Sequence, residues 1–133
     1  MKKKRFIIGI ALLLALAAGR LSLRGQSTDQ ESDPVKVTPH MYKVRLENAY
    51  VRVLEYHSQP GEKEAMHYHP PGIVYSFSDA TMLITDRQGH TEERHVKVGE
   101  VAWRNKTWHA AENTGTTEIH ALAIELKMPL ADL

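Results

Sequence analysis

Short apolar stretches separated by turn residues fill the middle of the chain. They mix β-branched and aromatic residues, as strands do, and show no sustained period of 3.6 residues that would predict a helix. The predicted strands are 50–56, 64–69, 73–77, 81–85, 91–98, 101–103, 109–113 and 117–126. Many short strands with glycine or proline turns predict an antiparallel all-β sandwich or barrel, with a hairpin at Asp86–Gly89.

The alternation of residues in the last strand predicts which of its faces lies inside. Leu122, Ile124 and Leu126 share one face, because alternate residues of a strand point the same way. His120 lies on that face too, while two alanines and a glutamate occupy the other. We therefore expect His120 to face the interior.

The first part of the chain has a different composition. Four basic residues, Lys2 to Arg5, precede an apolar run of about 14 residues, shorter than the roughly 20 that a membrane-spanning helix needs. Residues 1–25 are predicted to be a signal peptide or an uncleaved N-terminal anchor. The protein is then exported, either periplasmic or secreted, or is anchored in the inner membrane by this segment alone. Beyond it, the predicted parts are a flexible polar linker (26–39), the folded domain (40–128) and a tail (129–133).

Composition narrows the classes of function. The chain has 133 residues, enough for one domain, and no cysteine, which excludes disulfides, thiol nucleophiles and cysteine-ligated metals. Its formal net charge is +1 and the basic cluster belongs to the N-terminal segment, so we expect no nucleic-acid partner. The sequence has no glycine-rich phosphate loop, G-x-S-x-G elbow or HExxH helix. Eight histidines remain as the signal with chemical content.

Two of these histidines, His67 and His69, are separated by one residue in the predicted strand 64–69. Their rings should point to the same side of the strand, where two imidazoles can hold one metal ion. Glu64 differs in parity from His67, so we expect it to face away.

The spacing of glycines and histidines resembles the cupin family. Gly61-x5-His67-x-His69 is similar to the opening of the first cupin motif, and Gly99-x9-His109-x3-Asn113 to the glycine, histidine and asparagine of the second. The resemblance covers roughly residues 48–126. It implies a double-stranded β-helix, or jelly-roll, barrel in which His67, His69 and His109 coordinate a divalent metal. Ligand type leaves iron, manganese, zinc, nickel and copper open.

The sequence departs from the family pattern at two places. The family usually has a glutamate three or four residues after the second histidine, and none of Gly72, Ile73 and Val74 is a carboxylate. Asn105 and Thr107 stand where the family typically has proline and glycine. A site reduced to three histidines either leaves positions on the metal open for water or substrate, or binds metal weakly or not at all.

Together these features predict an exported small cupin, a metal-dependent dioxygenase or isomerase that acts on a small molecule. The alternative is a non-catalytic cupin that holds a small ligand with weak or absent metal. No catalytic residue is assigned. The two candidates are Glu55, as an acid–base group, and His120, as a fourth metal ligand, a group behind the ligands or a residue of the barrel rim. We also expect a homodimer. Trp108 is a candidate for the pocket mouth, a dimer contact or the core.

Overall fold

The computed structural model describes residues 32–127. Within this range the chain forms one short helix, α2 (Pro34–Val37), and nine strands, so it is nearly all-β, as predicted. The strands are β1 (Tyr42–Glu47), β2 (Val51–Ser58), β3 (Lys63–His69), β4 (Gly72–Ser76), β5 (Ala80–Thr85), β6 (Thr91–Val96), β7 (Val101–Arg104), β8 (Thr107–Asn113) and β9 (Ile119–Leu126).

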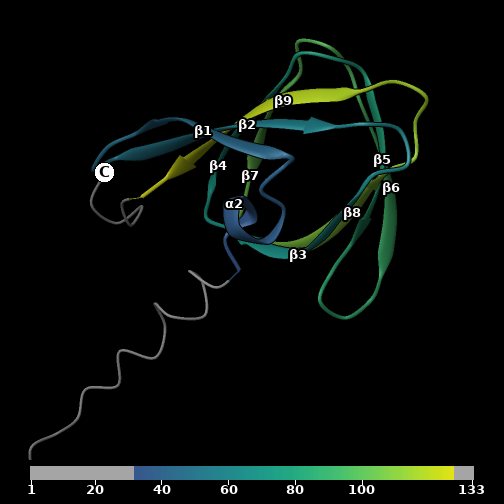
Figure 1. Ribbon diagram of the computed structural model, residues 1–133, viewed down its shortest axis with the longest axis horizontal. Coiled ribbons are helices and arrows are strands. Elements are labelled where there is room, and N and C mark those ends of the chain that lie inside the picture. The colour runs from purple at the N-terminus through teal and green to yellow at the C-terminus, as the bar shows by residue number, and fades with distance from the viewer. Residues whose placement is uncertain (1–31, 128–133) are drawn as a thin grey trace, which may run out of the picture.

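Two antiparallel sheets face each other across the interior (Figure 1). One has the strand order β1-β2-β9-β4-β7 and the other β3-β8-β5-β6. β5 and β6 form the predicted hairpin, but most neighbours are distant in sequence, such as β2 with β9 and β3 with β8. This arrangement is the predicted double-stranded β-helix, and it brings the two histidine-bearing segments together.

The inward face of β9 is the opposite of the predicted one. Ile119, Ala121, Ala123 and Glu125 are buried, whereas the alternate residues are only half-buried. The expectation that His120 faces the interior is therefore wrong. Small alanines point inward because the barrel contains a cavity, and the inward carboxylate is paired with cations, so apolarity alone selected the wrong face.

The segment before the first strand belongs to the domain. Asp33 caps α2 by accepting a hydrogen bond from Val35 N at 3.0 Å, and Pro34 at the first position of the helix is buried. Asp33 Oδ2 also lies 2.7 Å from Arg52 Nη1 on β2. The predicted flexible linker is therefore wrong over residues 33–39, because the ion pair and the buried proline hold this stretch against the sheets.

The remaining N- and C-terminal predictions fall elsewhere. The predicted signal or anchor (1–25), residues 26–31 of the predicted linker and the tail (129–133) lie outside the described residues. Among residues 32–127, no helix has the length and apolar character needed to cross a membrane.

Candidate metal centre

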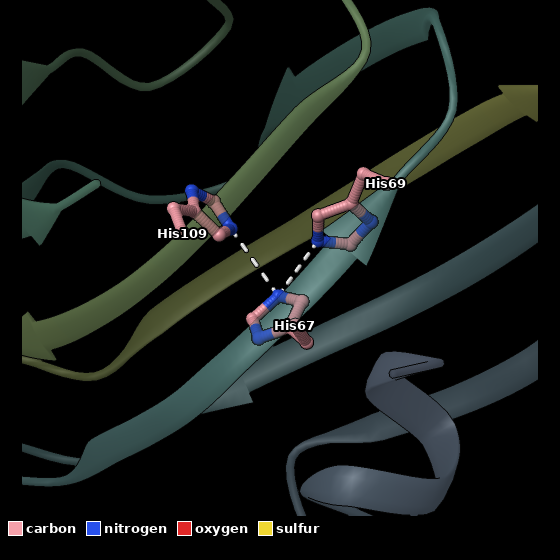
Figure 2. A group of neighbouring side chains, drawn as sticks. All are labelled: His67, His69 and His109. Carbon is pink, nitrogen blue, oxygen red and sulfur yellow. Dashed lines mark hydrogen bonds between the residues drawn. The ribbon is translucent and has the colours of Figure 1, made fainter. Parts of the chain in front are cut away.

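The three predicted ligands meet inside the barrel (Figure 2). His67 and His69 project from β3 on the same side, and His109 comes from the neighbouring strand β8, where it is paired directly with His67. His67 and His69 are fully buried, and His109 is half-buried at the wall of the cavity. The strand period brings the first two together, and the β3–β8 register adds the third.

The ring nitrogens lie at distances suited to one ion. His67 Nε2 is 2.9 Å from His69 Nε2 and 3.2 Å from His109 Nε2, and the three ligand atoms lie within 4.8 Å of one another. Metal–imidazole bonds of about 2.0–2.1 Å place ligand nitrogens roughly 3 Å apart around a four-coordinate ion. The geometry of the three rings therefore fits a single metal.

The opposite ring nitrogens determine where the ring protons lie. His67 Nδ1 is 2.7 Å from the Ala65 carbonyl oxygen, and His69 Nδ1 is 2.6 Å from Glu125 Oε1. Both partners only accept hydrogen bonds, so each Nδ1 carries a ring proton. In neutral rings the two Nε2 atoms then present lone pairs to each other at 2.9 Å. A cation satisfies all three nitrogens, and donation from Nδ1 to a carbonyl or carboxylate is usual for metal-bound histidine.

Burial favours the neutral form of His69 and His109. It lowers the pKa of His69 well below the ordinary 6.5, with the charge of Arg104 as the next cause. Burial, followed by the neighbouring His69, lowers the pKa of His109 to about 2. Neutral imidazole is the form that binds a metal, so the rings need no deprotonation to serve as ligands at neutral pH.

Glu64 lies beside the histidines, contrary to the prediction that it faces away. A register shift between Glu64 and His67 marks a bulge in β3, which changes the parity and turns the glutamate inward. Glu64 is 6% exposed, and its Oε2 is 3.3 Å from His67 Nε2. Sequence reasoning missed this residue because strict alternation does not allow for a bulge.

Two tyrosines hold the Glu64 carboxylate. Tyr42 Oη donates to Oε2 and Tyr56 Oη donates to Oε1, both at 2.7 Å. Burial raises the pKa of each tyrosine above its usual value of 10, and the Glu64 charge raises it further. Both hydroxyls therefore keep their protons and fix the carboxylate in place next to the ligand nitrogens.

No carboxylate stands at Gly72, Ile73 or Val74, the positions where the cupin pattern usually has a glutamate. At Gly72 a Cβ atom would meet the Ile124 carbonyl oxygen at 2.1 Å, so the backbones of β4 and β9 approach too closely for any side chain. Ile73 is exposed and Val74 lines the cavity. Glu64 is therefore the carboxylate that lies next to the ligand nitrogens in this chain.

Glu125 on β9 supports His69 from behind. Its Oε2 accepts from Arg52 Nε and lies 2.8 Å from Arg52 Nη2, while its Oε1 accepts from His69 Nδ1. Arg52 also reaches Asp33, the cap of α2. A chain of charged contacts thus runs from the helix to the candidate metal ligand.

The second motif's asparagine has a structural role. Asn113 Nδ2 donates to the carbonyl oxygens of Ser58 and Thr117, and Asn113 O accepts from Gly61 N. Gly61 has a φ of 81°, which favours glycine. These two motif residues hold the loops at one end of the barrel and are not part of the candidate metal centre.

Glu55 and His120, the two catalytic candidates, do not join this site. They lie with His57 on the outer face of the five-stranded sheet. There His120 Nε2 is 3.0 Å from Glu55 Oε1, and the His120 ring stacks on the His57 ring. Their ligand atoms are also close enough to hold an ion. However, Arg45 Nε already donates to Glu55 at 2.6 Å, so the carboxylate has a cation. Both residues lie away from the cavity, so the prediction that His120 is a metal ligand or a group behind the ligands is wrong.

A cavity of about 390 Å³ opens beside the histidines. The polar part of its wall includes His109, Glu64, Tyr42 and Arg104. Apolar residues form much of the remaining wall: Val74, Met82, Ile84, Val96, Ile119, Ala121 and Ala123. The volume is within the range of small-molecule sites in proteins.

Comparison with known proteins identifies the fold. No known family profile matches the chain, and no curated protein does. A cupin domain from Bordetella pertussis Tohama I superposes with a TM-score of 0.62 at 23% identity, over 66% of this chain and 93% of that one. A double-stranded β-helix protein from Klebsiella pneumoniae gives 0.53 at 23% identity, over 65% and 76%. A cupin from Methanocaldococcus jannaschii gives 0.52 at 12% identity, over 64% and 77%. The described part of this chain therefore has the double-stranded β-helix fold that these cupin structures share.

Proposed function

We propose that the protein is an exported small cupin that binds one divalent transition metal through His67, His69 and His109, and that it catalyses oxygenation or isomerisation of a small molecule. The observation that carries the proposal is the convergence of three ring nitrogens: His67 Nε2 lies 2.9 Å from His69 Nε2 and 3.2 Å from His109 Nε2, while the Nδ1 atoms of His67 and His69 face oxygen acceptors. Iron, manganese, zinc, nickel and copper all accept such neutral nitrogen ligands.

When bound, the metal supplies Lewis acidity or, for a redox-active ion, electron transfer. The protein supplies the remaining functions. His67, His69 and His109 would hold the ion, and His109 lines the cavity. Glu64 Oε2, next to His67 Nε2, is in place to accept a proton from a ligand in the cavity. Tyr42 and Tyr56 keep that carboxylate oriented.

The test is the metal content of the full chain after loading with each metal in turn and removal of excess. We expect close to one equivalent in the wild type and none in a His67→Ala/His69→Ala double variant. His120→Ala, on the outer face, is the control and should retain the metal. Equal metal content in wild type and double variant would end the proposal.

The alternative function is ligand binding without turnover, and the apolar wall of the cavity favours it. A ligand that binds the folded but not the unfolded chain raises thermal stability, by an amount that grows with the logarithm of its concentration above Kd. Stabilisation by a small molecule that persists unchanged in chelator would support this alternative over the metal-dependent one.

A further inference from the structure

Arg104 lines the cavity from β7. It alternates with the exposed Val101 and Trp103, and its side chain is 16% exposed. Its Nη2 lies 3.4 Å from Glu125 Oε1, the oxygen that contacts His69 Nδ1 at 2.6 Å, so it lies close to the candidate metal centre. An arginine in this place can reach a molecule that occupies the cavity and touches the metal ligands.

The guanidinium of Arg104 is poorly paired. Its Nη2 lies 3.4 Å from Glu125 Oε1, an oxygen already taken by His69 Nδ1 at 2.6 Å. The other oxygen of Glu125 is taken by Arg52 at 2.8 Å. Among the described residues, the buried Nε of Arg104 has no hydrogen-bond partner. A buried unpaired donor costs stability, and a partner that occupies the cavity would remove this cost.

The charges around the cavity indicate what that partner is. Three cations and three carboxylates line it: Arg94, Arg104, Lys106, Glu64, Glu92 and Glu100. The three positive and three negative charges cancel. The positive charge that attracts a ligand therefore comes from the proposed divalent metal, because neutral imidazole ligands do not reduce its charge. A ligand with one negative charge is favoured over a polyanion such as phosphate. A planar carboxylate also matches the fork of a guanidinium.

The cavity wall indicates the rest of the ligand. The wall is also lined by aliphatic and methionine side chains, including Val74, Ile84 and Ile119. Burial of apolar surface against them favours a hydrocarbon or aromatic body. The volume of about 390 Å³ accommodates a compact molecule of this kind.

We propose that Arg104 binds the carboxylate of a small, largely apolar monocarboxylic acid, beside the metal centre and with the apolar body in the barrel. The substrate class rests on the proposed function, while the role of Arg104 as the anion-binding group rests on its own geometry. Arg104 is thus a specificity-determining residue for the ligand of the cavity.

The test is calorimetric titration of the metal-loaded full chain with benzoate, acetate and benzyl alcohol. Benzoate has both the charge and the apolar body, and each of the others lacks one. We expect benzoate to bind at least about 10-fold more tightly than either. Arg104→Gln should weaken benzoate about 10-fold or more, with benzyl alcohol binding and metal content unchanged. Arg87→Gln, in the β5–β6 hairpin outside the cavity, is the control and should bind benzoate like the wild type.

A second variant separates loss of the subsite from loss of the fold. Ile84→Trp fills the apolar part of the cavity, so it should lose benzoate and keep acetate. Equal benzoate affinity in wild type and Arg104→Gln would overturn the inference, as would equal affinity for benzoate and benzyl alcohol. If the wild type retains no metal, the proposed function fails, whereas benzoate binding that still depends on Arg104 would uphold this inference.

Discussion

At the scale of single residues, the protons on the outer nitrogens of the histidines decide what the inner nitrogens can do. Glu125 accepts from His69 Nδ1 and is itself held by Arg52, so the ring is fixed in position and tautomer. Ala65 does the same for His67 through its backbone carbonyl. The proposed metal ligands are therefore oriented by groups outside the ligand set.

Loss of the Glu125 charge should weaken metal binding although the ligands remain. We expect Glu125→Gln to lower metal affinity about 10–100-fold, as changes behind metal-bound histidines typically do. Competition with a chromophoric chelator measures this affinity. Glu118→Gln is the matched control, since Glu118 contacts His57 Nδ1 on the outer face and should have no effect. Unchanged affinity in Glu125→Gln would show that His69 is not held in this way for a metal.

The tyrosine hydroxyls that hold Glu64 should contribute to stability. Tyr56→Phe removes a donor to a buried carboxylate and should lower the free energy of unfolding by about 1.5–3 kcal/mol. Urea unfolding monitored by circular dichroism measures the change. Tyr50→Phe, at a side chain that is 64% exposed, controls for the substitution itself. Equal losses in the two variants would contradict the role given to the Tyr56 hydroxyl.

At the scale of elements, the short helix α2 is joined to the barrel by Asp33. This residue caps the helix and pairs with Arg52, whose side chain is 17% exposed. Asp33→Ala should therefore lower the free energy of unfolding by about 1–3 kcal/mol, through loss of the cap and of a partly buried ion pair. Thermal or urea unfolding is the measurement. Lys36→Ala, exposed on the same helix, should change stability little. A similar loss of stability in the two variants would argue against the role given to the contact between Asp33 and Arg52.

Most strands could be predicted from the sequence because each is a short β-branched and aromatic run that ends at a glycine or proline. The turn residues also predicted the hairpin at Asp86–Gly89. The motif spacing predicted the convergence of His67, His69 and His109. β1 was not predicted, although its apolar and charged residues alternate strictly from Tyr42 to Glu47, which is a strand pattern. It lies before the cupin-like motif spacing and at the edge of a sheet, with its residues after Tyr42 exposed.

The errors have local physical causes. The bulge in β3 reverses the parity of Glu64, and no residue type in the sequence marks it. In β9 the inward positions are alanines and a glutamate, because the interior holds a cavity and an ion-pair network, so His120 was assigned to the wrong face. The helix α2 is held by long-range contacts of Asp33, which a local reading of a polar segment does not see.

At the scale of the whole molecule, the outer face of the five-stranded sheet exposes large apolar residues. Ile73, Phe77, Val101 and Trp103 are 37%, 43%, 65% and 51% exposed, and they belong to or adjoin β4 and β7. Neighbouring apolar residues on a surface are typical of an association site. This supports the expected homodimer.

Light scattering after size-exclusion chromatography tests that expectation. The wild type should have the mass of a dimer, and Val101→Arg should shift it toward the monomer, because burial of an unpaired charge opposes association. Val98→Arg, at a turn residue with 63% exposure, is the matched control and should remain dimeric. A monomeric wild type would rule out the dimer at this face.

The most direct test of the metal centre is X-ray absorption spectroscopy of the metal-loaded full chain. Zinc is a suitable first ion because it has no geometric preference of its own. We predict three imidazole nitrogens at about 2.0–2.1 Å, with the imidazole signal greatly reduced in the His67→Ala/His69→Ala variant. A spectrum dominated by oxygen ligands, or one that the double substitution leaves unchanged, would contradict the convergence of the three rings on a single ion.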